Sequence, residues 1–150
     1  MFLAHWDNKA SNQRLVCQVP GDSEGAGGMP CPRPFALIHD LGATFGPNKM
    51  EIEHWKAAPI WADPARCLVS MRQFSYQGGT FPDAQISEAG RQLIARQLAA
   101  FSERQVVALF TAARFPEFFG GTGEGADVNA WVRVFRDKVR QIVDHAPCPA

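Results

Sequence analysis

The chain carries no excess of either charge and has no apolar run long enough to cross a membrane. Fifteen Lys and Arg residues balance 15 Asp and Glu residues, so the formal net charge is zero. A neutral chain gives no electrostatic reason to expect binding to nucleic acid or to an anionic membrane surface. No apolar stretch approaches the ~20 residues that a transmembrane helix needs. We therefore expect neither a nucleic-acid partner nor a membrane span.

Signals for secretion and for internal repetition are also missing. Residues 1–4 lead directly into polar residues, which is not the pattern of a signal peptide. If Met1 is an internal residue of a longer protein, this says nothing about secretion. The 150 residues are 46% apolar and 20% charged, which is typical of one globular domain with a sizeable core.

The cysteines leave the redox compartment open. None of the four, at positions 17, 31, 67 and 148, forms a C-x-x-C pair, and this argues against a zinc knuckle. Cys17 ends one apolar stretch and Cys31 lies shortly before the next, so a disulfide between them could close the loop, a stabilisation of roughly 3 kcal/mol. The alternative is two free thiols. The default localisation is cytoplasmic, and a periplasmic or secreted protein is expected if Cys17–Cys31 is a disulfide.

The N-terminal part predicts a β-hairpin with a long loop. Residues 13–17 suit a short strand and residues 35–39 a second, buried strand. Residues 18–34, which are rich in Gly and Pro, predict the loop between them. Residues 43–66 show little periodicity, and residues 67–76 are typical of a further strand.

The C-terminal half is predicted to be helical. One apolar stripe recurs at helical spacing through Ile86, Ala89, Leu93, Ile94, Leu98 and Phe101, and Ser87 or Asp83 could cap its start. Ser102 and Gln105 form a capping-box pattern before a second stripe of Val106, Val107, Phe110 and Ala113.

A third, strongly amphipathic helix is expected after Asp127. Its predicted apolar face holds Trp131, Val132, Phe135, Val139, Ile142 and Val143. Its predicted polar face holds Arg133, Arg136, Asp137, Lys138 and Arg140.

Two short motifs in the N-terminal part carry acidic, basic and amide side chains that could act together at one site. The first reads H-x-D-x-K-x-x-N, from His5 through Asp7 and Lys9 to Asn12, and the strand of residues 13–17 follows it. The second is Asp-Leu-Gly at residues 40–42, directly after the strand of residues 35–39. In order and context, the pair resembles the catalytic loop and the metal-binding loop of the protein kinase-like superfamily.

The resemblance implies a phosphotransferase that uses ATP with Mg²⁺ or Mn²⁺. Asp7 would be the catalytic base, and Lys9 would neutralise charge on the γ-phosphate. Asn12 would bind one metal ion, and Asp40 would bridge the metal ions and the nucleotide phosphates. Gly42 would permit a backbone conformation that is costly for other residues. The phosphoryl acceptor stays open among protein, lipid head group, sugar and small molecule.

The resemblance covers only residues 5–42 and departs from the usual pattern in places. Trp6 stands where many kinases have the Arg that senses a phosphorylated activation segment, and Leu41 replaces Phe. Ala58-Pro59-Ile60 is the nearest segment to Ala-Pro-Glu, and it lacks the Glu. These departures indicate an atypical member of the superfamily.

The fold expected from this resemblance is α+β and like a kinase C-terminal lobe, with a small β-hairpin region packed on a mainly helical C-terminal half. Residues 1–150 would be one partial domain and would lack the N-terminal lobe, which in a kinase encloses the nucleotide together with the C-terminal lobe. We expect the chain alone to carry half a site and not to turn over ATP.

Three alternatives stay open at this stage. Asp7, Asn12 and Asp40 could make ordinary turn and capping hydrogen bonds in a non-catalytic interaction module, either a pseudokinase lobe or an unrelated binding domain. The side chains of His5, Asp7, His39 and Asp40 could instead cluster as a transition-metal site. Trp55 and Trp61 could form an exposed peptide-binding surface or serve as buried anchors.

Overall fold

The computed structural model describes residues 2–5, 10–17, 34–38, 44–45, 51–72, 83–114, 117 and 122–149. Within these ranges the fold is α+β and mostly helical, with two small antiparallel sheets, as the sequence predicts. The strands are β1 (Gln13–Cys17), β2 (Pro34–Ile38), β3 (Leu68–Ser70) and β4 (Asp83–Gln85). The helices are α1 (Ile52–Ala57), α2 (Glu88–Ala99), α3 (Glu103–Ala112) and α5 (Val128–Val143), with 3-10 turns at Ala10–Asn12, Pro64–Arg66 and Glu124–Ala126. No helix in these ranges has the length and hydropathy of a membrane span.

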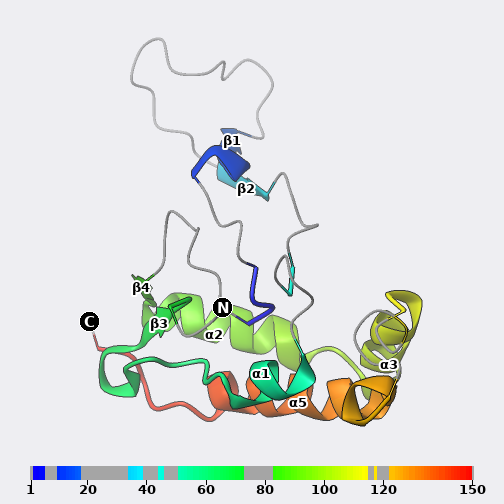
Figure 1. Ribbon diagram of the computed structural model, residues 1–150. Helices are drawn as coiled ribbons and strands as arrows, with labels where there is room; N and C mark the ends of the chain where they lie inside the picture. Colours follow the sequence, from blue (N-terminus) through cyan, green and yellow to red (C-terminus); the bar gives the residue numbers. More distant parts are fainter. Residues whose placement is uncertain are drawn as a thin grey trace.

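Helices α1, α2 and α3 all pack against helix α5, and the four together form a helical layer with α5 at its centre (Figure 1). Its buried face carries Trp131 and Phe135, and α3 contributes Phe110 to the same core. Trp55 of α1 is fully buried and stacks on Trp131 with ring centroids 5.8 Å apart. Because each large aromatic side chain removes 150–250 Å² from water, roughly, this cluster is the main hydrophobic anchor of the layer. Trp55 is therefore a buried anchor.

Local capping signals set where the helices begin. The Ser102 side chain accepts the backbone N–H of Gln105 at 3.2 Å, and the Gln105 side chain accepts the backbone N–H of Ser102 at 2.8 Å. Ser87 accepts the N–H of Gly90 at the start of α2, and Asp127 caps α5. The predicted capping box and the other two helix starts are confirmed, because these bonds depend only on neighbouring residues.

The predicted apolar stripe of α2 is largely wrong. Leu93, with 51% of its surface exposed, and its neighbour Ile94 face away from the core, and Phe101 beyond the helix is also exposed. The helix instead buries Arg91 and Ala95. These two residues lie four apart, on the face that packs against α5, whereas Leu93 and Ile94 lie on other faces.

The β1–β2 hairpin is confirmed, but the expected burial of its second strand is wrong. The two strands are antiparallel, and Gln13 pairs with Ile38 at one end and Cys17 with Pro34 at the other. Phe35 is 49% exposed, and Ala36 and Leu37 are exposed as well. In Figure 1 the hairpin lies above the helical layer, apart from α2 and α5, so no described helix covers it. The predicted packing of the hairpin on the helical half is therefore not observed for these strands.

Two segments between the hairpin and α2 differ from prediction. The strand expected at residues 67–76 is limited to β3, which pairs with β4, and residues 73–76 lie outside the described residues. Helix α1 lies within residues 43–66, where no helix was expected. It has only six residues, and fewer than two turns are too few to show a helical period.

Candidate functional site

Of the five predicted site residues, the structure describes Asn12. This residue ends the 3-10 turn Ala10–Asn12 and directly precedes β1, as the motif predicts. Its side chain is half-buried. The other four, Asp7, Lys9, Asp40 and Gly42, lie outside the described residues.

The register of the hairpin relates the chain positions of the two motifs. Gln13, the residue after Asn12, pairs with Ile38, and Asp40 follows Ile38 by two residues. Along the chain, the two motifs therefore adjoin the pair formed by Gln13 and Ile38, Asn12 before β1 and Asp40 two residues after β2.

The alternative sites in this region are described only in part. His5 is half-buried, whereas His39, Asp7 and Asp40, which would complete the proposed transition-metal cluster, lie outside the described residues. The proposed Cys17–Cys31 disulfide depends on Cys31, which also lies outside them.

One face of the hairpin carries exposed apolar side chains. Val16 and Phe35 are paired across the strands, and Leu37 lies two residues after Phe35 on the same face. All three are exposed. A contiguous apolar face of this kind is typical of a surface that contacts another domain or protein.

The helical layer holds two buried cations that sequence reasoning missed. Lys138 is 2% exposed, so its assignment to the polar face of α5 is wrong. Its ammonium group donates a hydrogen bond to the backbone carbonyl of Ala58, and no carboxylate in the described part of the chain forms an ion pair with it. Burial lowers the pKa of Lys138 to about 8 because it disfavours the charged form. The burial of Lys138 could have been predicted from helical spacing, because Lys138 lies seven residues after Trp131 and therefore on the same face of the helix.

The second buried cation, Arg91, connects α2 to the C-terminal end of α5. Its guanidinium donates to the carbonyl of Ile142 at 2.9 Å and to the carboxylate of Glu88 at 2.6 Å. Glu88 in turn accepts the backbone N–H of Cys148 at 2.8 Å. The bond to Arg91, followed by that to Cys148, lowers the pKa of Glu88 to about 2. A carboxylate in this setting stays charged and holds the C-terminal segment against α2.

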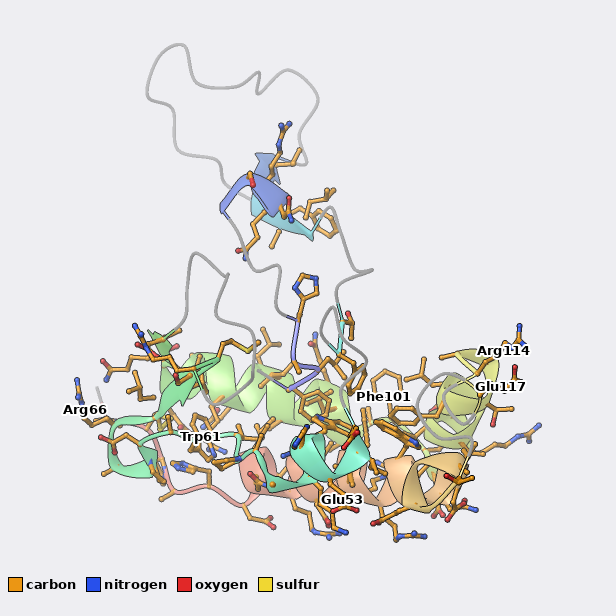
Figure 2. All side chains as sticks on the ribbon, viewed as in Figure 1. Glu53, Trp61, Arg66, Phe101, Arg114 and Glu117 are labelled. Carbon is orange, nitrogen blue, oxygen red and sulfur yellow. A yellow bond between two sulfur atoms is a disulfide. The ribbon has the colours of Figure 1, made fainter. Side chains whose placement is uncertain are left out.

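A disulfide joins the same C-terminal segment to the start of β3. Cys67 and Cys148 are bonded, and both are buried. The Nδ1 atom of His145 lies 3.8 Å from the sulfur of Cys67, and its ring packs on Trp61 with centroids 4.3 Å apart. Figure 2 labels Trp61 at the end of the helical layer that also carries Arg66. Trp61 is buried and is therefore an anchor like Trp55. The disulfide could not have been predicted from local spacing, because its two cysteines are 81 residues apart.

Compared with protein-family models, with curated proteins and with solved structures, the chain matches none of them.

Proposed function

We propose that this chain is the kinase-like part of a phosphotransferase that uses ATP with Mg²⁺ or Mn²⁺ and belongs to a longer protein. The observation that supports this most is the antiparallel hairpin with Asn12 directly before its first strand and Asp40 two residues after its second. A catalytic loop and a metal-binding loop must meet at one place, and two motifs that flank a hairpin in this order along the chain are compatible with that requirement.

The residue types fit the chemistry of phosphoryl transfer. Mg²⁺ and Mn²⁺ prefer oxygen ligands, which the amide of Asn12 and the carboxylate of Asp40 supply. In this proposal Asp7 orients the acceptor hydroxyl, which attacks the γ-phosphorus as the bond to ADP breaks. Lys9 neutralises charge on the transferring phosphoryl group, and Gly42 permits the turn after Asp40.

The exposed apolar face of the hairpin gives the proposal a second, weaker support. In a two-lobed enzyme, a further domain would cover Val16, Phe35 and Leu37. The same face equally favours the second candidate function, a non-catalytic interaction module, because a protein partner could cover it.

Mg²⁺-dependent nucleotide binding distinguishes these two functions. The natural full-length protein is titrated with a fluorescent ATP analogue with and without Mg²⁺, together with Asn12→Ala, Asp40→Ala and, as a matched control, Asp137→Ala on the exposed face of α5. We expect binding that needs Mg²⁺, is lost in the first two variants and is unchanged in the control. Nucleotide binding that is absent, or that survives Asp40→Ala, would leave the interaction module as the better proposal.

The acceptor is sought only after that result. ATP turnover by the full-length protein, lost in Asp7→Asn with nucleotide binding retained, would support the catalytic role of Asp7. Robust ATP-dependent phosphorylation by the 150 residues alone would contradict the expectation that this chain carries half a site.

A further inference from the structure

Cys67, His145 and Cys148 form a compact group of metal-ligating side chains, here called the sulfur–imidazole cluster. One ligand atom from each residue lies within 4.8 Å of the other two. The cluster is far from the kinase-like motifs in sequence, and it does not depend on the proposed function. In the structure the two sulfurs are bonded to each other.

Contacts other than the disulfide hold each member of the cluster in place. The backbone carbonyl of Cys67 accepts the N–H of Ile86 at 2.9 Å, and the N–H of Cys148 donates to Glu88 at 2.8 Å. The His145 ring packs on Trp61, whose indole N–H donates to the carbonyl of Gln141 at 2.8 Å. Breaking the sulfur–sulfur bond therefore removes one of several connections and leaves the three side chains near one another.

The geometry of the cluster suits a tetrahedral metal ion once the disulfide is reduced. Zinc binds thiolates at ~2.3 Å, which places two sulfurs on the same ion about 3.8 Å apart. The Cα atoms of Cys67 and Cys148 are 5.6 Å apart, so side-chain rotation can open the sulfurs to this distance. The Nδ1 atom of His145 lies 3.8 Å from the Cys67 sulfur and 2.6 Å from the carbonyl oxygen of Ala146, so ligation through Nδ1 needs the tautomer with its proton on Nε2 and a turn of the ring away from that carbonyl.

Charge balance points to the same ion. Cys67 is fully buried and Cys148 nearly so, and an uncompensated charge in such a place is costly. Two thiolates and one neutral imidazole offset the two charges of Zn²⁺, which leaves the site neutral. Soft thiolate ligands also favour zinc over the Mg²⁺ or Mn²⁺ of the proposed phosphotransferase.

We propose that the sulfur–imidazole cluster is a redox-controlled zinc site, closed as a disulfide and open to Zn²⁺ when reduced. A dithiol reductant transfers two electrons and two protons to the Cys67–Cys148 bond, which becomes two thiols while the reductant becomes a disulfide. Binding of Zn²⁺ then breaks both S–H bonds, forms two S–Zn bonds and releases two protons to solvent. The imidazole is the third ligand, and water takes the fourth position.

The test uses the chain with Cys17→Ser and Cys31→Ser, so that the cluster holds the only thiols. This background protein is reduced with a phosphine, freed of reductant without oxygen and dialysed against Zn²⁺, beside an oxidised sample. We expect one Zn²⁺ per reduced chain and none per oxidised chain. Co²⁺ in place of Zn²⁺ should give the visible absorption of a tetrahedral thiolate site.

His145→Ala separates the proposed site from simple thiol binding. Loss of a direct ligand should weaken Zn²⁺ binding at least about tenfold, whereas His54→Ala on the exposed side of α1 should not change it. The proposal is overturned if the reduced chain binds no Zn²⁺, if the oxidised chain binds it equally, or if the two histidine variants behave alike. Near-ultraviolet circular dichroism of the tryptophans reports the fold: a signal that reduction leaves in place, or that Zn²⁺ restores, supports the site, and a signal that stays absent with Zn²⁺ overturns it.

Discussion

Lys138 of α5 donates a hydrogen bond to the backbone carbonyl of Ala58, the residue 80 positions earlier that directly follows helix α1. The bond satisfies a carbonyl at a helix end and ties α1 to the centre of the helical layer. It also takes a cation out of water, a cost that the charge of the neighbouring Asp137 offsets only in part. Burial lowers the pKa of Lys138 to about 8. The free energy of unfolding should therefore depend on pH in the alkaline range, where this amine loses its proton in the folded chain.

Replacement of Lys138 by Met is expected to remove an alkaline rise in stability. Between pH 8 and 10.5 the unfolded chain keeps the proton on Lys138, whereas the folded chain has lost it. The unfolded state then binds more protons, so the free energy of unfolding increases with pH across this window, by on the order of 2–3 kcal/mol in total. Urea unfolding at several pH values measures this rise in the wild type and its absence in Lys138→Met.

The exposed Lys56→Met is the matched control for this prediction. The wild-type free energy of unfolding minus that of Lys138→Met should slope upward with pH, and the corresponding difference for Lys56→Met should not. A flat difference for Lys138→Met would mean that the folded chain keeps this lysine as easily charged as the unfolded chain does.

Glu88→Gln is expected to flatten the acid side of the stability profile. Arg91 and the backbone N–H of Cys148 lower the pKa of Glu88 from 4.5 to about 2 in the folded chain. Its contribution is therefore fully present above pH 4.5 and is lost as the pH falls toward 2. The variant should be less stable than the wild type at neutral pH, and the difference should shrink between pH 4.5 and 2 in thermal unfolding.

Glu103→Gln, in the first turn of α3, tests whether this effect belongs to any helix-start carboxylate. Glu103 is exposed, so its substitution should produce a much smaller change. Equal effects of the two substitutions would assign the acid dependence to helix dipoles, and not to the contacts of Arg91 and Cys148.

Features that depend on a few neighbouring residues could be predicted from the sequence. The start of α3 follows from Ser102 and Gln105 alone, and the β1–β2 hairpin from two short apolar strands around a Gly- and Pro-rich segment. For the candidate site, the same local reasoning places Asn12 directly before β1, which is confirmed. The roles of Asp7, Lys9, Asp40 and Gly42 stay predictions.

Features that depend on which distant segment packs against each side of a helix could not be predicted from neighbouring residues. Leu93 has the side chain of a core residue, but the packing of α2 on α5 buries Arg91 instead, because a backbone carbonyl and Glu88 can satisfy its charge. The prediction that Lys138 lies on the polar face of α5 is wrong for the same reason. Its burial depends on a hydrogen bond to a carbonyl that is distant in the sequence, that of Ala58. The pairing of Cys67 with Cys148 reflects the path of the chain through the whole helical layer.

Ser102→Ala is expected to destabilise the protein by about 1 kcal/mol, within a range of about 0.5–2. The substitution leaves the N–H of Gln105 without its acceptor at the start of α3. Thr111→Ala in the same helix is the control, because Thr111 is exposed and Ala favours helices slightly more than Thr. Urea unfolding should therefore rank Ser102→Ala below the control, and the reverse order would mean that the capping box is not a stabilising feature in solution.

Removal of the Cys67–Cys148 disulfide is expected to lower the free energy of unfolding by roughly 2–5 kcal/mol. The bond closes a loop with a sequence separation of 81, for which the chain-entropy model gives about 4.5 kcal/mol. Cys67→Ser with Cys148→Ser, unfolded by urea in the presence of a metal chelator, measures the loss without any contribution from Zn²⁺. Because Glu88, Arg91 and Trp61 still connect the C-terminal segment to the layer, the variant should unfold in one cooperative step at lower urea. A separate early transition would show instead that the disulfide alone holds this segment in place.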